Sequence, residues 1–126
     1  MSKILISPSK YIQGPGEIKK LGAYAAGYGK KALILISKGG YKRIGAQIEE
    51  SFKDQACETE FDFFQGECSK TEISRLTEVM KEKSCDLVIG IGGGKIFDTA
   101  KAVAYYQKTP VVICPTIAST DAPCSA

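Results

Sequence analysis

Short, continuous apolar runs alternate with segments of helical periodicity along this chain, and this alternation limits its folds more than any other feature. The apolar runs cover residues 32–36, 87–91 and 111–114. A run that is apolar at every position suits a strand buried on both faces, which is typical of parallel sheets. Between such runs apolar residues recur at helical spacing, as at Ile44, Ile48 and Phe52. We expect βαβ units with right-handed crossovers, and therefore a three-layer, Rossmann-like α/β fold with a mainly parallel sheet.

Other segments carry their own signals. The segment 57–63 alternates apolar and acidic residues, and this period of two predicts a half-exposed strand, which we place at the edge of the sheet. A short helix is predicted over 18–25, where apolar residues recur at helical spacing. At the start of a later helix, the Ser69 hydroxyl can cap the amide of Glu72 while the Glu72 carboxylate reaches back to Ser69.

Bulk composition bounds the class of protein. Residues 1–126, 44% of them hydrophobic and 25% charged, suffice for one core, and we expect a single domain. The 17 basic residues are interspersed with 14 acidic ones, for a net charge of +3, which argues against nucleic acid or a membrane as partner. The first residues form too short an apolar stretch for a signal peptide, so we expect a cytoplasmic protein.

Cysteine and histidine usage limits the chemistry. The five cysteines are odd in number, and the chain has no histidine, so neither a disulfide framework nor a zinc site is indicated. We expect reduced thiols. Histidine is the commonest metal ligand and the usual general base near neutral pH. We therefore expect no metal site and no catalytic residue within these 126 residues.

A glycine-rich turn, Gly-Ile-Gly-Gly-Gly-Lys over residues 90–95, lies between a predicted buried strand and a predicted helix. Amides at a helix start are unpaired and the helix dipole favours an anion there, while glycine lets ligand oxygens approach the backbone. Lys95 stands where a Rossmann G-x-G-x-x-G needs its last glycine. Ile89 and Ile96 stand where a Walker loop needs glycine and then Ser or Thr. Two interpretations stay open at this point: a phosphate-binding turn, and a tight turn without a ligand.

Longer motifs around this turn favour a ligand. Residues 92–101, Gly-Gly-Gly-Lys-Ile-Phe-Asp-Thr-Ala-Lys, resemble the G-G-G-x-x-x-D-x-A-K signature of the iron-containing alcohol dehydrogenase family. Residues 115–123, Pro-Thr-Ile-Ala-Ser-Thr-Asp-Ala-Pro, and residues 7–14, Ser-Pro-Ser-Lys-Tyr-Ile-Gln-Gly, resemble the glycerol dehydrogenase branch of that family. The resemblance covers essentially the whole chain. It implies an oxidoreductase that oxidises glycerol or a similar polyol with NAD.

The resemblance also implies roles for individual residues. In the family the glycine turn binds the pyrophosphate of NAD, which implies cofactor contacts at Gly93, Gly94 and Lys95. Asp98 is predicted in the first turn of the helix, either as a cofactor contact or as an acid that stabilises the helix dipole. The remaining implied contacts are with the cofactor, at Thr116, Ser119 and Ser125, and with the substrate hydroxyls, at Asp121.

Two departures from the family bear on the cofactor and the metal. Ser37 and Lys38 follow the strand at 32–36, where the family's glycerol dehydrogenases carry an aspartate for the adenosine ribose. Serine can still bond a ribose hydroxyl, but the missing carboxylate and the lysine suit a 2′-phosphate, so NAD and NADP both remain candidates. The resemblance also implies a helical C-terminal domain that binds zinc or iron, and we expect residues 1–126 to lack that domain. We expect residues 1–126 alone to bind no metal and to oxidise no glycerol.

Three other interpretations stay open. The first is a noncatalytic dinucleotide-binding module that pairs with a full-length subunit or with itself as a homo-oligomer. The second keeps the fold but changes the substrate, as in glycerol-1-phosphate dehydrogenases and dehydroquinate synthases, although Asp121 would repel a substrate phosphate. The third is an α/β domain that binds nothing, because fold class alone does not imply function.

Overall fold

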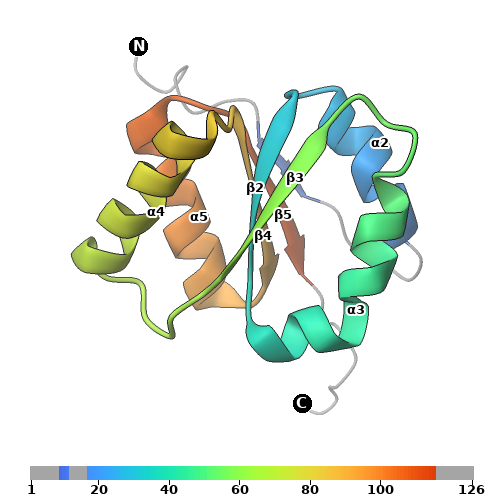
Figure 1. The fold of residues 1–126 in the computed structure, drawn as a ribbon. Coiled ribbons are helices and arrows are strands. Elements are labelled where there is room, and N and C mark those ends of the chain that lie inside the picture. Colours follow the sequence, from blue (N-terminus) through green and yellow to red (C-terminus); the bar gives the residue numbers. More distant parts are fainter. Residues whose placement is uncertain (1–8, 12–16, 116–126) are drawn as a thin grey trace.

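A computed structural model describes residues 9–11 and 17–115 of the chain (Figure 1). The described strands form one five-stranded sheet. The elements in chain order are β1 (Ser9–Tyr11), the 3₁₀ turn η1 (Glu17–Lys20), α2 (Leu21–Ala26), β2 (Lys31–Ile36), α3 (Lys38–Ser51), β3 (Glu58–Phe63), α4 (Lys70–Lys83), β4 (Leu87–Gly92), α5 (Gly94–Gln107) and β5 (Val111–Pro115). The three apolar runs are thus the strands β2, β4 and β5. The short helix predicted over 18–25 begins as η1 and continues as α2.

All neighbouring strands are parallel, in the order β1-β5-β4-β2-β3. Strand β3 lies at one edge, as the alternation in 57–63 predicted. From β2 the chain moves outward to β3 and then returns past β2 to β4, so the direction in which strands are added reverses between β2 and β4. The α/β, Rossmann-like fold predicted from the sequence is confirmed. Ligands of open α/β sheets bind at such a reversal, outside the carboxyl ends of the strands.

Helices cover both faces of the sheet, with α2 and α3 on one side and α4 and α5 on the other (Figure 1). Successive residues of β2 alternate between these faces. Ile34 packs in the cluster that contains Ile48 of α3, whereas Leu33 and Leu35 pack with residues of α4 and α5. Each of these side chains is fully buried. After Lys31 the strand is apolar at every position, because residues 32–36 are buried on both faces.

The capping box predicted at the start of α4 forms only in part. The Ser69 hydroxyl accepts a hydrogen bond from the amide of Glu72 at 3.1 Å, as predicted. The Glu72 carboxylate, however, turns to the amide of Gln65 at 3.0 Å and to the guanidinium of Arg75 instead of returning to Ser69. Glu72 therefore binds the preceding loop, because a charged partner and a backbone amide together stabilise its buried carboxylate better than one local bond.

Helix α2 contacts the end of α3 through a glycine. Gly22 is buried, and its amide donates to the Ser51 hydroxyl at 3.1 Å. A Cβ at position 22 would overlap the carbonyl group of Ser51. Backbone atoms cannot turn aside as the end of a side chain can, so the approach of the two helices requires glycine at this position.

We predict opposite effects for the same substitution at two helical glycines. Gly22→Ala should lower the free energy of unfolding by about 3 kcal/mol, because the helices must separate. Gly39→Ala, in the exposed first turn of α3, should raise it by about 0.5 kcal/mol through helix propensity, since the nearest atom to a Cβ there is 3.9 Å away. Urea denaturation of the two variants measures both values. Equal effects at the two positions would contradict the packing described for Gly22.

Candidate functional site

Two helix N-termini lie at the carboxyl edge of the sheet where the strand order reverses. Strands β2 and β4 are neighbours, with Ile36 paired to Ile91 near their carboxyl ends. Helix α3 begins directly after β2 and α5 directly after β4 (Figure 1). Both helix dipoles therefore present their positive ends at the same edge, which favours anions there.

The glycine turn between β4 and α5 contains glycines of two kinds. Gly92 has a φ of +142°, which L side chains rarely adopt, so the fold itself requires glycine there. Gly93 and Gly94 are exposed, and neither has a positive φ. A Cβ at either position would have no described atom within 4 Å. The fold does not require glycine at either position.

The start of α5 is open to a ligand. Gly93 is the N-cap residue, and within residues 9–11 and 17–115 no side chain caps the first amides of the helix. Those amides lack partners within the helix, and a Cβ at Gly93 or Gly94 would have no described atom within 4 Å. Amide donors, a helix dipole and room for close approach together match the oxygens of a phosphate group, so the residues present fit the pyrophosphate of a dinucleotide.

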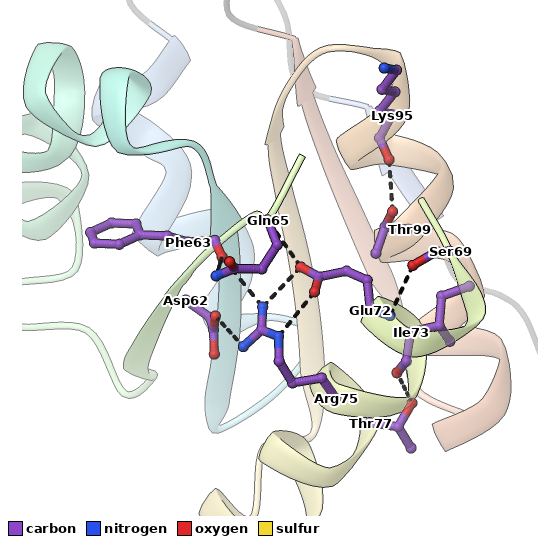
Figure 2. Close-up of polar contacts among 10 residues, drawn as sticks. All are labelled: Asp62, Phe63, Gln65, Ser69, Glu72, Ile73, Arg75, Thr77, Lys95 and Thr99. Carbon is purple, nitrogen blue, oxygen red and sulfur yellow. Dashed lines mark hydrogen bonds and ion pairs between the residues drawn. The ribbon is translucent and has the colours of Figure 1, made fainter. Parts of the chain in front are cut away.

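Lys95 adds a positive charge to this turn, and the charge is paired. Its Nζ donates to Oε2 of Glu67 at 3.0 Å. Its backbone carbonyl accepts from the hydroxyl of Thr99 at 2.8 Å (Figure 2). Glu67 lies in the loop between β3 and α4, and no local pattern in the sequence points to its contact with a residue 28 positions away.

The loop that carries Glu67, residues 64–69, is held at both ends by Glu72. The amide of Gln65 donates to Oε2 of Glu72, and the amide of Glu72 donates to the Ser69 hydroxyl (Figure 2). In addition, the amide of Phe64 donates to the carbonyl of Ile36 at 2.9 Å, which attaches the start of the loop to β2. The position of this loop beside the glycine turn is therefore set by hydrogen bonds rather than by chain length alone.

Arg75 joins Glu72 to the edge strand. Its Nε and Nη2 donate to the two carboxylate oxygens of Glu72 at 3.0 and 2.9 Å, and its Nη1 donates to Asp62 in β3 at 2.9 Å (Figure 2). Burial raises the pKa of Glu72, but hydrogen bonds from Arg75 and from the amide of Gln65 outweigh it, so the net pKa is lowered. The same contacts raise the pKa of Arg75. Both groups are ionised at neutral pH.

Ser37 and Lys38 form the start of the second helix at this edge. The Ser37 hydroxyl accepts from the amide of Gly40 at 2.9 Å and so caps α3. Lys38 is exposed, and the first turn of α3 contains no acidic residue. Capping leaves the O–H of Ser37 able to donate to a further acceptor.

The structure brings four of the eight predicted cofactor residues to one edge of the sheet. Ser37, Gly93, Gly94 and Lys95 lie at the two helix starts described above. Asp98 was expected in the first turn of α5, but the helix begins at Gly94 and has no acidic residue in its first turn. Asp98 is exposed one turn further on, where the helix dipole acts less on it. The predicted contacts outside the described residues are Thr116, Ser119, Asp121 and Ser125.

Other kinds of site find little support within residues 9–11 and 17–115. Burial raises the pKa of the Cys57 and Cys85 thiols to about 11, so neither is a thiolate at neutral pH. Over the same residues no group of three or more His, Cys, Asp or Glu side chains could hold a metal ion. None of the described helices is long and apolar enough to cross a bilayer.

The lowered pKa of Glu72 predicts a pH-dependent contribution to stability. A carboxyl whose pKa is lower in the folded state stabilises the fold above its ordinary value of 4.5, and this contribution disappears as the pH falls through the folded value. Glu72→Gln should therefore lower the free energy of unfolding by about 2 kcal/mol at pH 7 and by progressively less below pH 4.5. Urea denaturation across that range measures the difference.

Glu78→Gln is the matched control, because Glu78 lies in the same helix in an exposed ion pair with Lys81 at 3.7 Å. Its effect should stay below about 0.5 kcal/mol at every pH. A Glu72→Gln effect that did not depend on pH would show that the lost stability comes from packing rather than from the charge.

Comparisons with known proteins agree with the fold and the glycine turn. The sequence profile of the iron-containing alcohol dehydrogenase family matches residues 8–126. A glycerol dehydrogenase of Escherichia coli O6:H1 is 46% identical over 100% of this chain and 34% of its own length. A glycerol dehydrogenase of Thermotoga maritima is 48% identical over 96% of this chain and 33% of its own length.

Solved structures give the same picture. The crystal structure of a probable glycerol dehydrogenase from Sinorhizobium meliloti 1021 superposes with a TM-score of 0.77 and 46% identity, over 92% of this chain and 31% of that protein. The chain thus spans about a third of the length of the curated relatives that it matches. The family profile covers both the glycine turn and the segment after β5. The chain therefore belongs to the iron-containing alcohol dehydrogenase family.

Proposed function

We propose that residues 1–126 form the dinucleotide-binding domain of an NAD-dependent glycerol dehydrogenase. The observation that carries the proposal is the pair Gly93 and Gly94. The fold has room for a side chain at both positions, whereas close approach of a pyrophosphate to the backbone amides favours residues without a Cβ. Relatives at 40–48% identity are named glycerol dehydrogenases, which supports glycerol as the substrate of the whole protein.

In this proposal the chain binds and orients the cofactor. The amides at the start of α5 donate to the pyrophosphate oxygens, and the helix dipole and Lys95 offset their negative charge. Bound NAD supplies the acceptor for the hydride that leaves glycerol as dihydroxyacetone forms. Ser37 at the start of α3 binds the adenosine ribose through its hydroxyl, which can donate while it caps the helix.

The proposal extends to residues outside the described ranges. Thr116, Ser119 and Ser125 contact the cofactor, and Asp121 accepts hydrogen bonds from the substrate hydroxyls, as a carboxylate can from two donors at once. Asp98 is a secondary candidate for a cofactor contact, because it lies one turn beyond the open amides. The zinc or iron of the family would act as a Lewis acid on the alcohol, and the proposal assigns its ligands to none of the described residues.

A second candidate is the use of NADP. The exposed Lys38 follows Ser37 at the start of α3, and no acidic residue lies in the first turn of that helix to repel a 2′-phosphate. A lysine beside a positive helix end favours a phosphate monoester. This arrangement supports NADP as an alternative to NAD at the same site.

Calorimetric titration with NAD tests the principal proposal. Gly94→Ala should leave the free energy of unfolding unchanged or slightly higher, because its Cβ meets no atom, yet weaken NAD binding by about tenfold, because the Cβ blocks close approach to the amides. Lys95→Ala should weaken binding by about fivefold and reduce its dependence on salt.

Lys81→Ala is the matched control for Lys95→Ala. Like Lys95, Lys81 is an exposed helical lysine in an ion pair, in this case with Glu78. The control variant should bind NAD as the unaltered chain does. Unchanged NAD affinity in Gly94→Ala would mean that the turn is only a tight connection between strand and helix, and the proposal would fail.

The choice between NAD and NADP is tested by the same titration with Lys38→Ala. If the 2′-phosphate contacts Lys38, this change should weaken NADP binding by about fivefold and leave NAD binding unchanged. Lys53→Ala, in an exposed ion pair just beyond the far end of α3, is the control. An unaltered chain that binds NADP no better than NAD, with no effect of Lys38→Ala, would rule out the NADP alternative.

A further inference from the structure

Lys95 is the cation of the glycine turn, and its ammonium group forms an ion pair with the carboxylate of Glu67. The two charged atoms are 3.0 Å apart, with 63% of the Lys95 side chain and 74% of the Glu67 side chain exposed. An exposed pair of this kind is weak and can exchange partners. A phosphate that binds at the turn therefore meets a lysine that is bonded to a carboxylate, rather than a solvated one.

Hydrogen bonds on both sides of Glu67 hold its loop beside the glycine turn. The loop is attached at both ends to Glu72, whose side chain is only 5% exposed and is held by Arg75. The amide of Phe64 adds a bond to β2. Because the loop is tied down on both sides of Glu67, the carboxylate stays close to the turn even when it releases Lys95.

We propose that Glu67 determines the affinity and charge selectivity of the glycine turn. Its carboxylate competes with phosphate oxygens for Lys95 and repels anions at the turn, and both effects increase with the negative charge of the ligand. The residue therefore favours the pyrophosphate diester of a dinucleotide over free phosphates of higher charge. This inference rests on the proposed function, because it assumes that the turn binds pyrophosphate.

The charge difference between the two ligands is large enough to measure. A terminal phosphate group carries about −1.5 at pH 7, so free inorganic pyrophosphate, at about −3, carries roughly one and a half times the charge of the same group esterified at both ends. Removing one nearby negative charge should thus help inorganic pyrophosphate more than NAD. Glu67→Gln removes that charge, keeps the size of the side chain and alters only exposed atoms.

The test is calorimetric titration of the full chain with NAD and with inorganic pyrophosphate, for the unaltered protein and for Glu67→Gln. We expect Glu67→Gln to lower the Kd for NAD about threefold and the Kd for pyrophosphate about fivefold. The gain should be smaller when Lys95→Ala is also present. Glu50→Gln is the control, because it removes the same charge from an exposed ion pair at the far end of α3.

Each outcome decides between the two proposals. If the unaltered chain binds NAD but Glu67→Gln binds neither ligand more tightly than Glu50→Gln does, the role of Glu67 is overturned and the dinucleotide site stands. A gain of equal size for both ligands, or one that does not depend on Lys95, also overturns it. If no variant binds either ligand, the dinucleotide proposal fails and the inference about Glu67 fails with it.

Discussion

The central strands β2 and β4 are buried on both faces, and the rest of the structure depends on that constraint. Strands without an exposed face must be covered by helices on both sides, so the chain has to cross the sheet in right-handed βαβ units. Strand order then reverses between β2 and β4. The reversal brings the start of α3 and the start of α5 to one edge, where two helix dipoles point at the same space.

A network of hydrogen bonds and ion pairs stabilises the edge strand β3, where no residue is fully buried. Strand β3 has one neighbour, and its residues are half-buried. Arg75 bonds Asp62 on that strand and both oxygens of the buried Glu72, which in turn bonds the loop beyond it. Because both carboxylate oxygens of Glu72 have a charged or backbone partner, burial of Glu72 is tolerated. The network stabilises the edge and also positions the loop beside the glycine turn.

Local patterns predicted much of this fold and part of the site. The apolar runs became β2, β4 and β5, and the Ser69 cap formed where its sequence pattern placed it. The same pattern misplaced the Glu72 carboxylate, which bonds Gln65 and Arg75 instead of Ser69, since a capping-box rule considers only the first turn of a helix. Asp98 was predicted in the first turn of its helix, but Gly94 is already helical, so Asp98 lies just beyond that turn.

The sequence by itself determined the strands β2 to β5 and the helices between them, and where a glycine turn opens a helix, because periodicity and turn chemistry act over a few neighbouring residues. Only the tertiary structure decided that the fold requires Gly22, where a Cβ would overlap the backbone of Ser51, and does not require Gly93 or Gly94, where a Cβ would meet no described atom. It also decided the strand order and the contact of Glu67 with Lys95. These features join residues far apart in the chain, and such contacts exist only after the layers have packed together.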